Sequence, residues 1–254
     1  MTAAGDDRAG SVLVTGAAGA IGGATVRCFV EAGLHVIALD RDRAVLDDAG
    51  PCVAAYHVDV ADARGVADAI ADACATRVLR HVVGVAGGAL PSEPATRDDP
   101  ASLSPEEFRA SVDANLVTQY VVLHAALPWL RRATGADRSV TFTSSFNALA
   151  GWGMPAYSAA KAGLIGLMHA LTASLGAEGI RVNVVAPGTV RTPRTERIWR
   201  DDVDHFPRLA ATTALGRLGT PDDVARAYLA LATTLTHVTG QVLVVDGGQS
   251  TKRP

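Results

Sequence analysis

The sequence predicts an α/β fold in which a doubly wound, seven-stranded parallel sheet carries helices on both faces within a single domain. Short β-branched runs alternate along the chain with longer Ala-rich stretches of helical period, which is the rhythm of βαβ units. The short runs are apolar throughout, as is typical of strands covered on both faces. A length of 254 residues, with 48% apolar and 19% charged residues, fits one large domain better than two small ones.

Seven short runs are expected to form the strands, joined by right-handed crossovers. In chain order they cover residues 11–15, 35–40, 52–58, 81–87, 139–144, 181–187 and 241–247. Helices are expected over residues 20–33, 42–49, 62–78, 104–132 and 155–177, and after the Thr220-Pro221 start signal. The stretch between the sixth strand and about residue 218 is expected to be irregular.

Charge and cysteine content narrow the range of partners and cofactors. The formal net charge is -3, and the 23 basic and 26 acidic residues form no cluster of like charge, so neither a nucleic-acid nor a membrane partner is expected. Three cysteines without a CxxC pair or suitable His spacing predict no metal site and reduced thiols, hence a cytoplasmic location. Residues 1–9 lack the pattern of a signal peptide and are expected to be a flexible N-terminus before a domain of residues 10–254.

A glycine-rich segment, TGAAGAIGG at residues 15–23, follows the first strand and opens the first helix. Glycines allow a tight turn and the close approach of a pyrophosphate, and a helix N-terminus offers free N–H groups and the positive end of its dipole. A plain structural turn is the alternative, but the strand before it and the helix after it favour a dinucleotide site. The expected binding residues here are Gly16, Gly19, Ala20 and Ile21.

The second strand ends in an acid, Asp40, which lies 24 residues beyond Gly16. A carboxylate there accepts hydrogen bonds from both ribose hydroxyls of an adenosine and repels a 2′-phosphate, so NAD is the favoured cofactor. The next residue, Arg41, would instead pair with a 2′-phosphate, which leaves NADP open. Asp59 and Val60 follow the third strand and are placed to meet the adenine edge. Asp40 and Asp59 are alternatively N-caps of the helices that follow them.

Tyr157 and Lys161 stand four residues apart in AYSAAKAGL, a run of small side chains inside an expected helix. Positions i and i+4 share one helix face, so the phenol and the amine are expected to be neighbours. A phenol can give or take the proton that accompanies hydride transfer by a nicotinamide cofactor, and an ammonium beside it would lower its pKa. The alternative is a solvated pair on an exposed helix face.

The order and spacing of five motifs resemble the short-chain dehydrogenase/reductase family over nearly the whole chain. The motifs are TGxxxGxG at the first strand, Asn115 in DANL, the Ser pair closing the fifth strand, YxxxK at residues 157–161, and NxxxPG at residues 183–188. The resemblance implies a Rossmann fold and a catalytic tetrad of Asn115, Ser145, Tyr157 and Lys161. In that tetrad the lysine also contacts the nicotinamide ribose, and the asparagine holds a water that links the lysine to solvent.

Two members of this tetrad have alternatives. Ser144 lies 13 residues before Tyr157, the separation most common in the family, whereas Ser145 matches the usual position in the strand-end serine pair. Ser145 is chosen because the strand fixes where a hydroxyl points, while the loop before the tyrosine can lose a residue at little cost. Asn115 alternatively caps or kinks a buried helix.

The cofactor end shows one departure from the family. Residues 84–87 read GVAG where the family usually has Asn-Asn-Ala-Gly. Gly84 and Gly87 still allow the backbone to approach the cofactor, and Ala86 and Gly87 are expected to bind it. The loss of the side-chain amides predicts a locally looser scaffold. The resemblance further implies a nicotinamide clamp, with a plain turn as the alternative, formed by Pro187, Gly188, Val190 and Thr192.

Residues 193–214 are expected to form a mobile lid that selects the substrate. The aromatic side chains of this stretch, Trp199, His205 and Phe206, alternatively serve ordinary packing or an oligomer contact. Arg191, just before the stretch, and Arg194 and Arg197 within it either bind an acidic substituent of the substrate or are solvated. Loops 89–100 and 146–154 are expected to supply the other walls. The small residues of the Tyr157 helix, through the helix pairing usual in the family, predict a homodimer or homotetramer.

These features together predict an oxidoreductase that interconverts a secondary alcohol and a ketone, with a small-molecule substrate and a nicotinamide cofactor. Two other classes of protein are the alternatives. A lyase or epimerase with tightly held NAD would retain its cofactor through purification without net turnover. A non-catalytic nucleotide-sensing protein would have no need to keep Ser, Tyr and Lys together.

Overall fold

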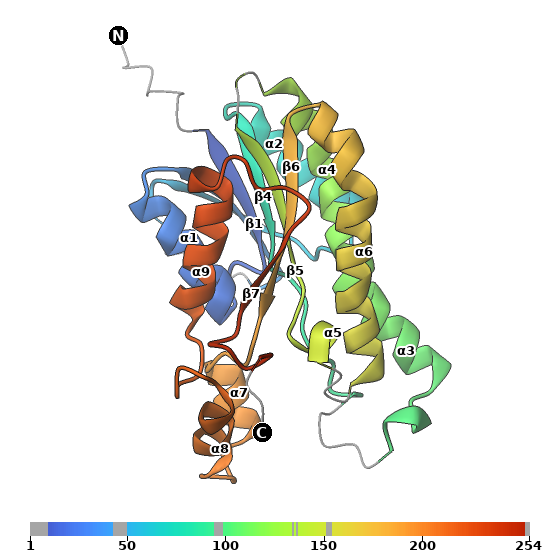
Figure 1. Cartoon of the computed structure of the whole chain (residues 1–254). Coiled ribbons are helices and arrows are strands. Elements are labelled where there is room, and N and C mark those ends of the chain that lie inside the picture. The colour runs from blue at the N-terminus through green and yellow to red at the C-terminus, as the bar shows by residue number, and fades with distance from the viewer. Residues whose placement is uncertain are drawn as a thin grey trace.

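A computed structural model describes residues 10–42, 50–93, 99–133, 135, 137–150 and 154–251, apart from the side chain of Ile198. Over these ranges the chain forms one parallel sheet of seven strands in the order β3-β2-β1-β4-β5-β6-β7 (Figure 1). The strands are β1 Ser11–Thr15, β2 His35–Asp40, β3 Val53–His57, β4 Leu79–Gly84, β5 Arg138–Thr143, β6 Ile180–Pro187 and β7 Val242–Val245. The expected α/β class and all seven strands are confirmed.

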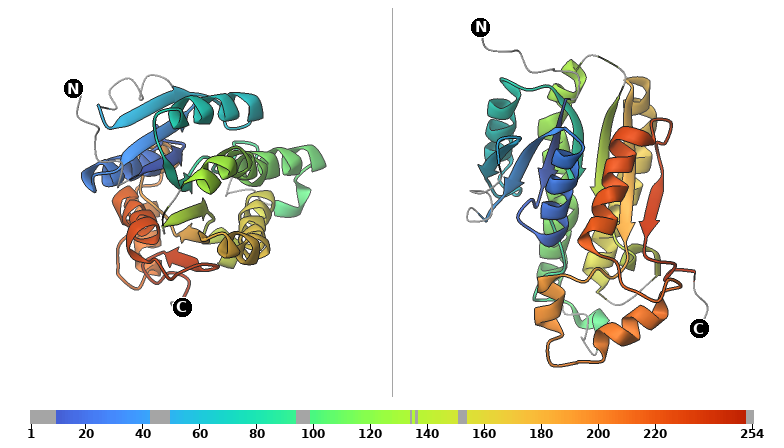
Figure 2. Two further views of the ribbon diagram at one scale, coloured as in Figure 1. Left: turned by 90° about the horizontal axis from the view of Figure 1, so that it is seen from above. Right: turned by 90° about the vertical axis from the view of Figure 1, so that its left-hand side faces the viewer.

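Helices cover both faces of the sheet. The views agree that α1 and α9 lie on one face and α2, α4 and α6 on the other (Figures 1 and 2). The longer helices are α1 Ala20–Glu31, α2 Ala63–Cys74, α3 Pro105–Val112, α4 Thr118–Arg132, α6 Pro155–Ala177, α8 His205–Thr212 and α9 Pro221–Leu229. The short ones are η1 Pro100–Ser102, η2 Asp113–Val117, α5 Asn147–Ala150, α7 Pro193–Ile198 and η3 Ala230–Thr234. None of the described helices is long and apolar enough to cross a membrane.

Two apolar clusters hold these layers together. Leu13, Val140 and Leu164 belong to the cluster under α2, α4 and α6, and Val12, Phe29 and Tyr228 to the cluster under α1 and α9. Neighbouring residues of β1 enter opposite clusters because successive side chains of a strand point to opposite faces. The sheet is thus covered on both faces, as its uniformly apolar strands predict.

Local sequence explains where several helices begin. Thr220 caps α9 through a hydrogen bond from the Asp223 N–H, the Asp223 carboxylate accepts the Thr220 N–H in return, and Pro221 occupies the first turn. Such a reciprocal capping box satisfies two N–H groups that would otherwise lack partners. In the same way, the Asp62 side chain caps α2. The Thr-Pro start signal therefore predicts the beginning of α9 correctly.

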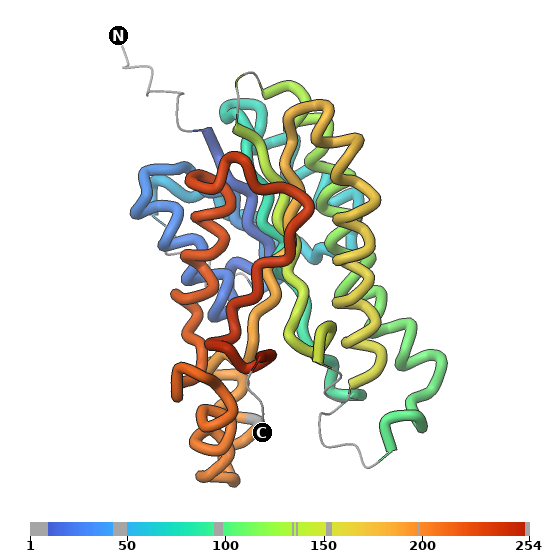
Figure 3. Tube along the Cα trace, in the orientation of Figure 1, coloured from blue at the N-terminus to red at the C-terminus, as the bar shows by residue number. Residues whose placement is uncertain are grey.

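Two expectations about the elements are wrong. The stretch after β6 contains α7 and α8, and the tube trace leads from β6 through these two helices and back to α9 (Figure 3). The single helix expected over 104–132 is instead α3 and α4 joined by a π-turn, η2. The expected helix at 42–49 and the expected flexible residues 1–9 fall outside the described residues, save for Asp42.

The carboxyl ends of the parallel strands lie at one edge of the sheet. The start of α6, the short helix α5 and the α7–α8 segment all lie at this end, at the bottom of Figure 1. Ligands of open α/β sheets bind at this edge. The candidate site is therefore built from the segments that follow the strands.

Candidate active site

The glycine-rich loop after β1 fits a bound pyrophosphate. Gly16 has a φ of +66°, and a Cβ there would lie 2.9 Å from backbone atoms of Ala86, while a Cβ at Gly22 would lie 1.9 Å from the Gly16 carbonyl oxygen. Only glycine is compatible with this turn. The N-cap of α1, Gly19, makes no side-chain cap bond, and the first turn with Ala20 and Ile21 has no acidic residue. The N–H groups of this turn are therefore suited to an anion.

A second loop lies against the first. The Thr15 hydroxyl accepts the N–H groups of Val85 and Ala86, both at 3.1 Å. Gly87 has a φ of +133°, and a Cβ there would lie 2.8 Å from Asn115 Oδ1 and 3.4 Å from Lys161 Nζ. This loop thus joins the glycine-rich turn to the residues of the expected tetrad.

Asp40 faces the glycine-rich turn from the end of β2. Its Oδ2 accepts the Ala18 N–H and its Oδ1 the Asp42 N–H, each at 2.9 Å. Arg41 is exposed and points to Asp59 at the rim, with Nη1 4.0 Å from the carboxylate. Half-buried Val60 packs against the core behind them. The four residues predicted for the adenosine end therefore lie near one another.

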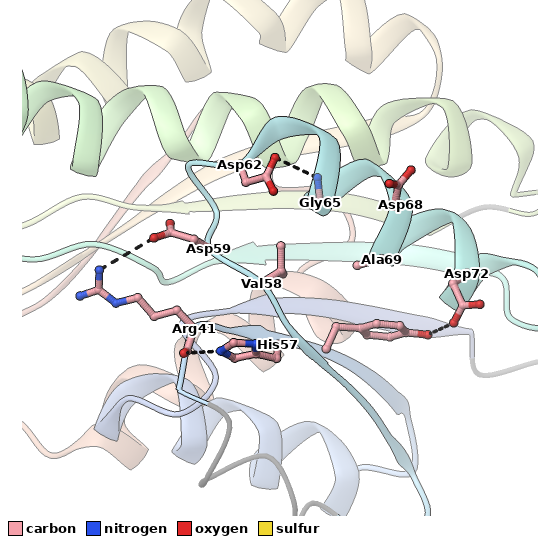
Figure 4. Close-up of a pocket in the computed structure, with 10 residues that line it drawn as sticks. Arg41, His57, Val58, Asp59, Asp62, Gly65, Asp68, Ala69 and Asp72 are labelled. Atoms are coloured by element: carbon pink, nitrogen blue, oxygen red, sulfur yellow. Dashed lines mark hydrogen bonds and ion pairs between the residues drawn. The ribbon is translucent and has the colours of Figure 1, made fainter.

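A groove runs along the outer edge of the sheet between β3 and α2 (Figure 4). Arg41, His57 and Asp59 line one end, and Asp72 accepts a hydrogen bond from Tyr56 at the other. The groove shares only its Arg41 and Asp59 end with the predicted adenosine site. The residues around Tyr157 lie elsewhere, beyond β1 and β4.

Tyr157 and Lys161 lie on one face of α6, as their spacing predicts. Lys161 is buried, its Nζ donates to the Thr143 carbonyl at 2.9 Å, and this nitrogen lies 5.6 Å from the centroid of the Tyr157 ring. Thr143 is the last residue of β5. The amine is thus anchored to the strand end beside the phenol, and the solvated alternative is excluded for Lys161.

The two serines that follow β5 have different partners. The Ser144 hydroxyl donates to the Lys161 carbonyl at 2.7 Å, inside the protein. The Ser145 hydroxyl accepts the Asn147 N–H at 3.2 Å and donates to Asn147 Oδ1 at 3.3 Å, and it acts to lower the pKa of the Tyr157 phenol. Of the two serines, Ser145 therefore combines a position at the strand end with an influence on Tyr157.

Asn115 lies in the π-turn between α3 and α4. Its Oδ1 accepts the Gly88 N–H at 2.7 Å, and its Nδ2 donates to the carbonyls of Gly88 at 3.1 Å and Ser111 at 3.0 Å. A π-turn often marks a functional position in a helix. The helix departs from regular α geometry at Asn115, as the structural alternative for this residue expects, and the amide fastens the loop after β4. Its role in the tetrad stays a prediction.

The ionisation of this cluster differs from the sequence expectation. Burial raises the pKa of Tyr157, while the hydrogen bond from Ser145 and the positive charge of Arg194 act to lower it. Burial also lowers the pKa of Lys161 to about 7. In the described structure the positive charge that acts to lower the pKa of the phenol is that of Arg194, while burial disfavours the ammonium form of Lys161.

An amide that the sequence analysis missed occupies the space beside Gly84. The Gln119 side chain on α4 accepts the Thr143 N–H at 3.2 Å and donates to the Thr143 carbonyl at 3.3 Å. A Cβ at Gly84 would lie 2.8 Å from Gln119 Oε1. The end of β4, which the sequence predicted to lack a side-chain amide, thus has the amide of Gln119 from α4 beside it. The signal in the sequence was Gly84, because a glycine in a strand indicates that another group packs closely against it.

The segment after β6 leads into α7 and α8, the stretch that the sequence predicts to be a lid and that is called the lid below. Pro187 accepts the Phe146 N–H, Gly188 donates to Val245, and Val190 forms a single bridge with Gly219. The Thr192 hydroxyl caps α7 by accepting the Thr195 N–H at 3.2 Å. The hydroxyl expected to meet the nicotinamide is therefore engaged as a helix cap.

The lid aromatics pack on one another. The Trp199 and His205 rings stack with centroids 3.8 Å apart, and Phe206 meets His205 edge-on at 5.5 Å. Arg191 lies over the Phe206 ring, at 5.4 Å from the centroid, and pairs with Glu196. Ordinary packing accounts for these contacts.

The lid arginines separate into different roles. Arg197 donates to the Pro193 carbonyl within α7. Arg194 instead reaches out of the lid to the Ala89 carbonyl, and its guanidinium lies against Gly88. Arg194 therefore contacts the same loop after β4 to which Asn115 bonds. Its positive charge also acts to lower the pKa of Tyr157.

Comparison with known proteins agrees with this geometry. A family model described as enoyl-(acyl carrier protein) reductase matches residues 16–250. A solved oxidoreductase of the short-chain dehydrogenase/reductase family from Burkholderia thailandensis is 40% identical, with a TM-score of 0.85 over 96% of this chain and 93% of that one.

The chain belongs to the short-chain dehydrogenase/reductase family.

Two further members of this family have named activities. Mouse L-fucose dehydrogenase is 31% identical over 93% of this chain and 87% of its own length. The 2,5-dichloro-2,5-cyclohexadiene-1,4-diol dehydrogenase of Sphingobium indicum is 31% identical over 94% of this chain and 96% of its own length. The short-chain dehydrogenase/reductase described here is accordingly an oxidoreductase that acts on a CH–OH group of a small molecule, and its family uses nicotinamide cofactors.

Proposed function

We propose that this short-chain dehydrogenase/reductase interconverts a secondary alcohol and a ketone with Tyr157 as the proton-transfer group. The observation that carries the proposal is the position of Tyr157 beside Lys161, whose amine is anchored at the end of β5, where Ser145 acts on the phenol. The 85–88 loop connects this cluster to the glycine-rich turn. Proton-transfer groups and cofactor-binding turn are thereby adjacent at one edge of the sheet.

Each side chain has a separate task in this reaction. The Ser145 hydroxyl orients the substrate oxygen, and Tyr157 takes the hydroxyl proton during oxidation or returns it during reduction. Lys161 and Asn115 would connect this proton to solvent, and Lys161 would also bond to the ribose of a bound nicotinamide cofactor. A bound nicotinamide supplies the hydride acceptor or donor. Its phosphates would be held by Gly16, Gly19, Ala20 and Ile21, with Ala86, Gly87, Pro187, Gly188, Val190 and Thr192 around its ring end.

NAD is the proposed cofactor because Asp40 lies beside the glycine-rich turn. Its carboxylate would face an added 2′-phosphate, and the neighbouring Arg41 is drawn toward Asp59. NADH should therefore bind at least tenfold more tightly than NADPH, which corresponds to about 1.4 kcal/mol.

Fluorescence titration of both reduced cofactors tests this preference. Asp40→Ala should narrow the difference, whereas Arg41→Ala is the matched control that should leave it in place. Equal affinities in the wild type, or tighter binding of NADPH, would assign the 2′-phosphate to Arg41 and reverse the choice of cofactor.

The proposed substrate carries a secondary hydroxyl on a ring. The fucose and cyclohexadiene-diol dehydrogenases support this class by their names alone. Turnover should be measured with NAD on sugars and cyclic alcohols, and with NADH on the corresponding ketones. Turnover of ring alcohols above linear ones supports the class. Cofactor that is retained through purification, without net oxidation of any alcohol, would instead favour a lyase or epimerase.

A homodimer or homotetramer is proposed from the outer face of α6. Ala159, Ala162 and Gly166 are exposed along it, and nothing lies within 4 Å of a Cβ built at Gly166. Another helix can approach such a face closely. Gly166→Arg should therefore fold as the wild type does but lower the mass measured by light scattering. A wild-type monomer would refute the proposal.

The proposed location is the cytoplasm. Cys28, Cys52 and Cys74 are free thiols in the structure. Free thiols persist where glutathione and thioredoxin keep a compartment reducing.

A further inference from the structure

Glu93 is a buried carboxylate that the sequence analysis did not single out. Its residue is 1% exposed, although it belongs to the segment after β4 that runs along the surface. Its Oε1 accepts the Ala156 N–H at 2.7 Å, and its Oε2 accepts the Tyr157 N–H at 3.0 Å. Buried carboxylates are costly unless hydrogen-bonded, and here both oxygens bond to the first turn of α6.

The first turn of α6 depends on this partner. The N-cap residue, Met154, makes no side-chain cap bond and has a φ of +51°, a left-handed conformation that is uncommon for residues other than glycine. Pro155 has no N–H, so Ala156 and Tyr157 present the first N–H groups of the helix. Glu93 satisfies both, and its negative charge lies at the positive end of the helix dipole.

The segment that carries Glu93 also carries the contacts of the candidate site. Asn115 binds Gly88, Arg194 binds the Ala89 carbonyl, and the Glu93 N–H donates to Leu90 at 3.0 Å. Movement of residues 86–93 would therefore move Glu93. Because Glu93 bonds to the backbone of Tyr157 itself, that movement would also displace the phenol.

We propose that Glu93 is a positioning residue, whose carboxylate fixes the start of α6 and thereby sets the Tyr157 phenol against the 86–93 segment. The inference rests on the proposed role of Tyr157 in proton transfer. It adds that the segment beside the cofactor-binding turn and the proton-transfer group are held as one unit by a carboxylate.

Glu93→Ala removes both hydrogen bonds and should lower kcat by on the order of tenfold or more, because small misplacements of reacting groups are costly. NADH affinity should change little, since the glycine-rich turn is untouched. Glu93→Gln keeps an acceptor oxygen and should recover most of the lost kcat. Asp62→Ala is the matched control, because the Asp62 carboxylate likewise caps a helix, α2, by accepting the Arg64 and Gly65 N–H groups.

A double-mutant cycle separates positioning from simple stabilisation. Once Tyr157→Phe has removed the proton-transfer group, adding Glu93→Ala should cost no further turnover, whereas the loss of Tm should be the same in both backgrounds. Two results would show that Glu93 is only a structural cap. One is an unchanged kcat in Glu93→Ala, and the other is that Glu93→Ala lowers kcat by the same factor in the wild type and in Tyr157→Phe. If Glu93→Ala fails to fold, the same cycle is run with Glu93→Gln and Glu93→Asp, which differ in reach.

The cycle also keeps this inference distinct from the proposed function. Near-normal turnover of Tyr157→Phe alone would overturn the function. Loss of turnover in Tyr157→Phe together with normal turnover in Glu93→Ala would overturn only the positioning role.

Discussion

Ser144 and Ser145 are adjacent in sequence but have opposite surroundings. Ser144 turns its hydroxyl inward to the Lys161 carbonyl, while the Ser145 hydroxyl bonds to Asn147 and acts to lower the pKa of the Tyr157 phenol. Sequence spacing alone left both serines as candidates, because they differ by one residue in their distance from Tyr157 and the loop between can vary by that length. Their hydrogen-bond partners favour Ser145 as the residue that orients the substrate oxygen.

A matched pair of alanine variants tests this assignment. Ser145→Ala should lower kcat by on the order of 10², which is a typical contribution of a positioned hydrogen-bonding group. Ser144→Ala should lower Tm, because it removes a buried hydrogen bond to the Lys161 carbonyl, at a cost of about 0.5–1.5 kcal/mol. Kinetics and thermal melting of both variants check the prediction. The reverse pattern would transfer the role to Ser144.

Gln119 and Glu93 show why some site residues were not predictable. Each bonds to backbone groups of an element far away in sequence, Gln119 to Thr143 and Glu93 to α6. A side chain with a backbone partner leaves no motif, because any residue can supply an N–H or a carbonyl. Tyr157 and Lys161 were predictable because their helical spacing itself places them together.

At the scale of elements, α6 and the lid differ in how clearly the sequence marks them. The predicted bounds of the long helix, 155–177, agree with α6 because Pro155 opens it and a long Ala-rich run continues it. Helix α7 starts with a capping box at Thr192, followed by Pro193. This is the same Thr-Pro signal that predicted α9, but the short runs after it show no helical period long enough to detect.

Arg194 couples the lid to the ionisation of Tyr157. Its positive charge lowers the pKa of the phenol, so Arg194→Ala should raise that pKa further. The rate of alcohol oxidation rises with pH as the phenolate forms, and its midpoint should therefore move to higher pH in the variant. Arg197→Ala is the matched control, since Arg197 bonds within α7. The pH profile of kcat measures the shift, and an unchanged midpoint would contradict the coupling.

At the scale of the whole molecule, a histidine in the middle of the sheet makes stability depend on pH. His81 on β4 is buried and bonds to Ser139 on β5 at 3.0 Å. Burial lowers its pKa from 6.5 to about 4. Protons therefore bind the unfolded chain more readily than the folded protein between these two values.

His81 should therefore contribute full stability above pH 6.5 and lose it as the pH falls to about 4. The contribution corresponds to about 3 kcal/mol, because one pKa unit is worth about 1.4 kcal/mol. Urea unfolding from pH 7 down to pH 4 should show a steeper loss of unfolding free energy in the wild type than in His81→Gln. If the free energies of unfolding of both proteins fall in parallel, the folded protein takes up a proton at His81 as readily as the unfolded chain does.

The global architecture follows from sequence more completely than the site does. Seven apolar runs separated by helical stretches predict a covered parallel sheet, and the strands observed match those runs to within two residues at their starts. Burial on both faces imposes this pattern on every strand. The π-turn at Asn115 is different, because one extra residue per turn changes no apolar period, and so its sequence predicts a continuous helix.

The central claim is that Tyr157 transfers the proton, and Tyr157→Phe tests it most directly. The change removes one oxygen from a ring that stays in place, so the fold and NADH affinity should persist while kcat falls by on the order of 10² or more. Tyr120→Phe, on the exposed face of α4, is the matched control and should leave kcat unchanged. A Tyr157→Phe enzyme that turns over at a near-normal rate would contradict the account.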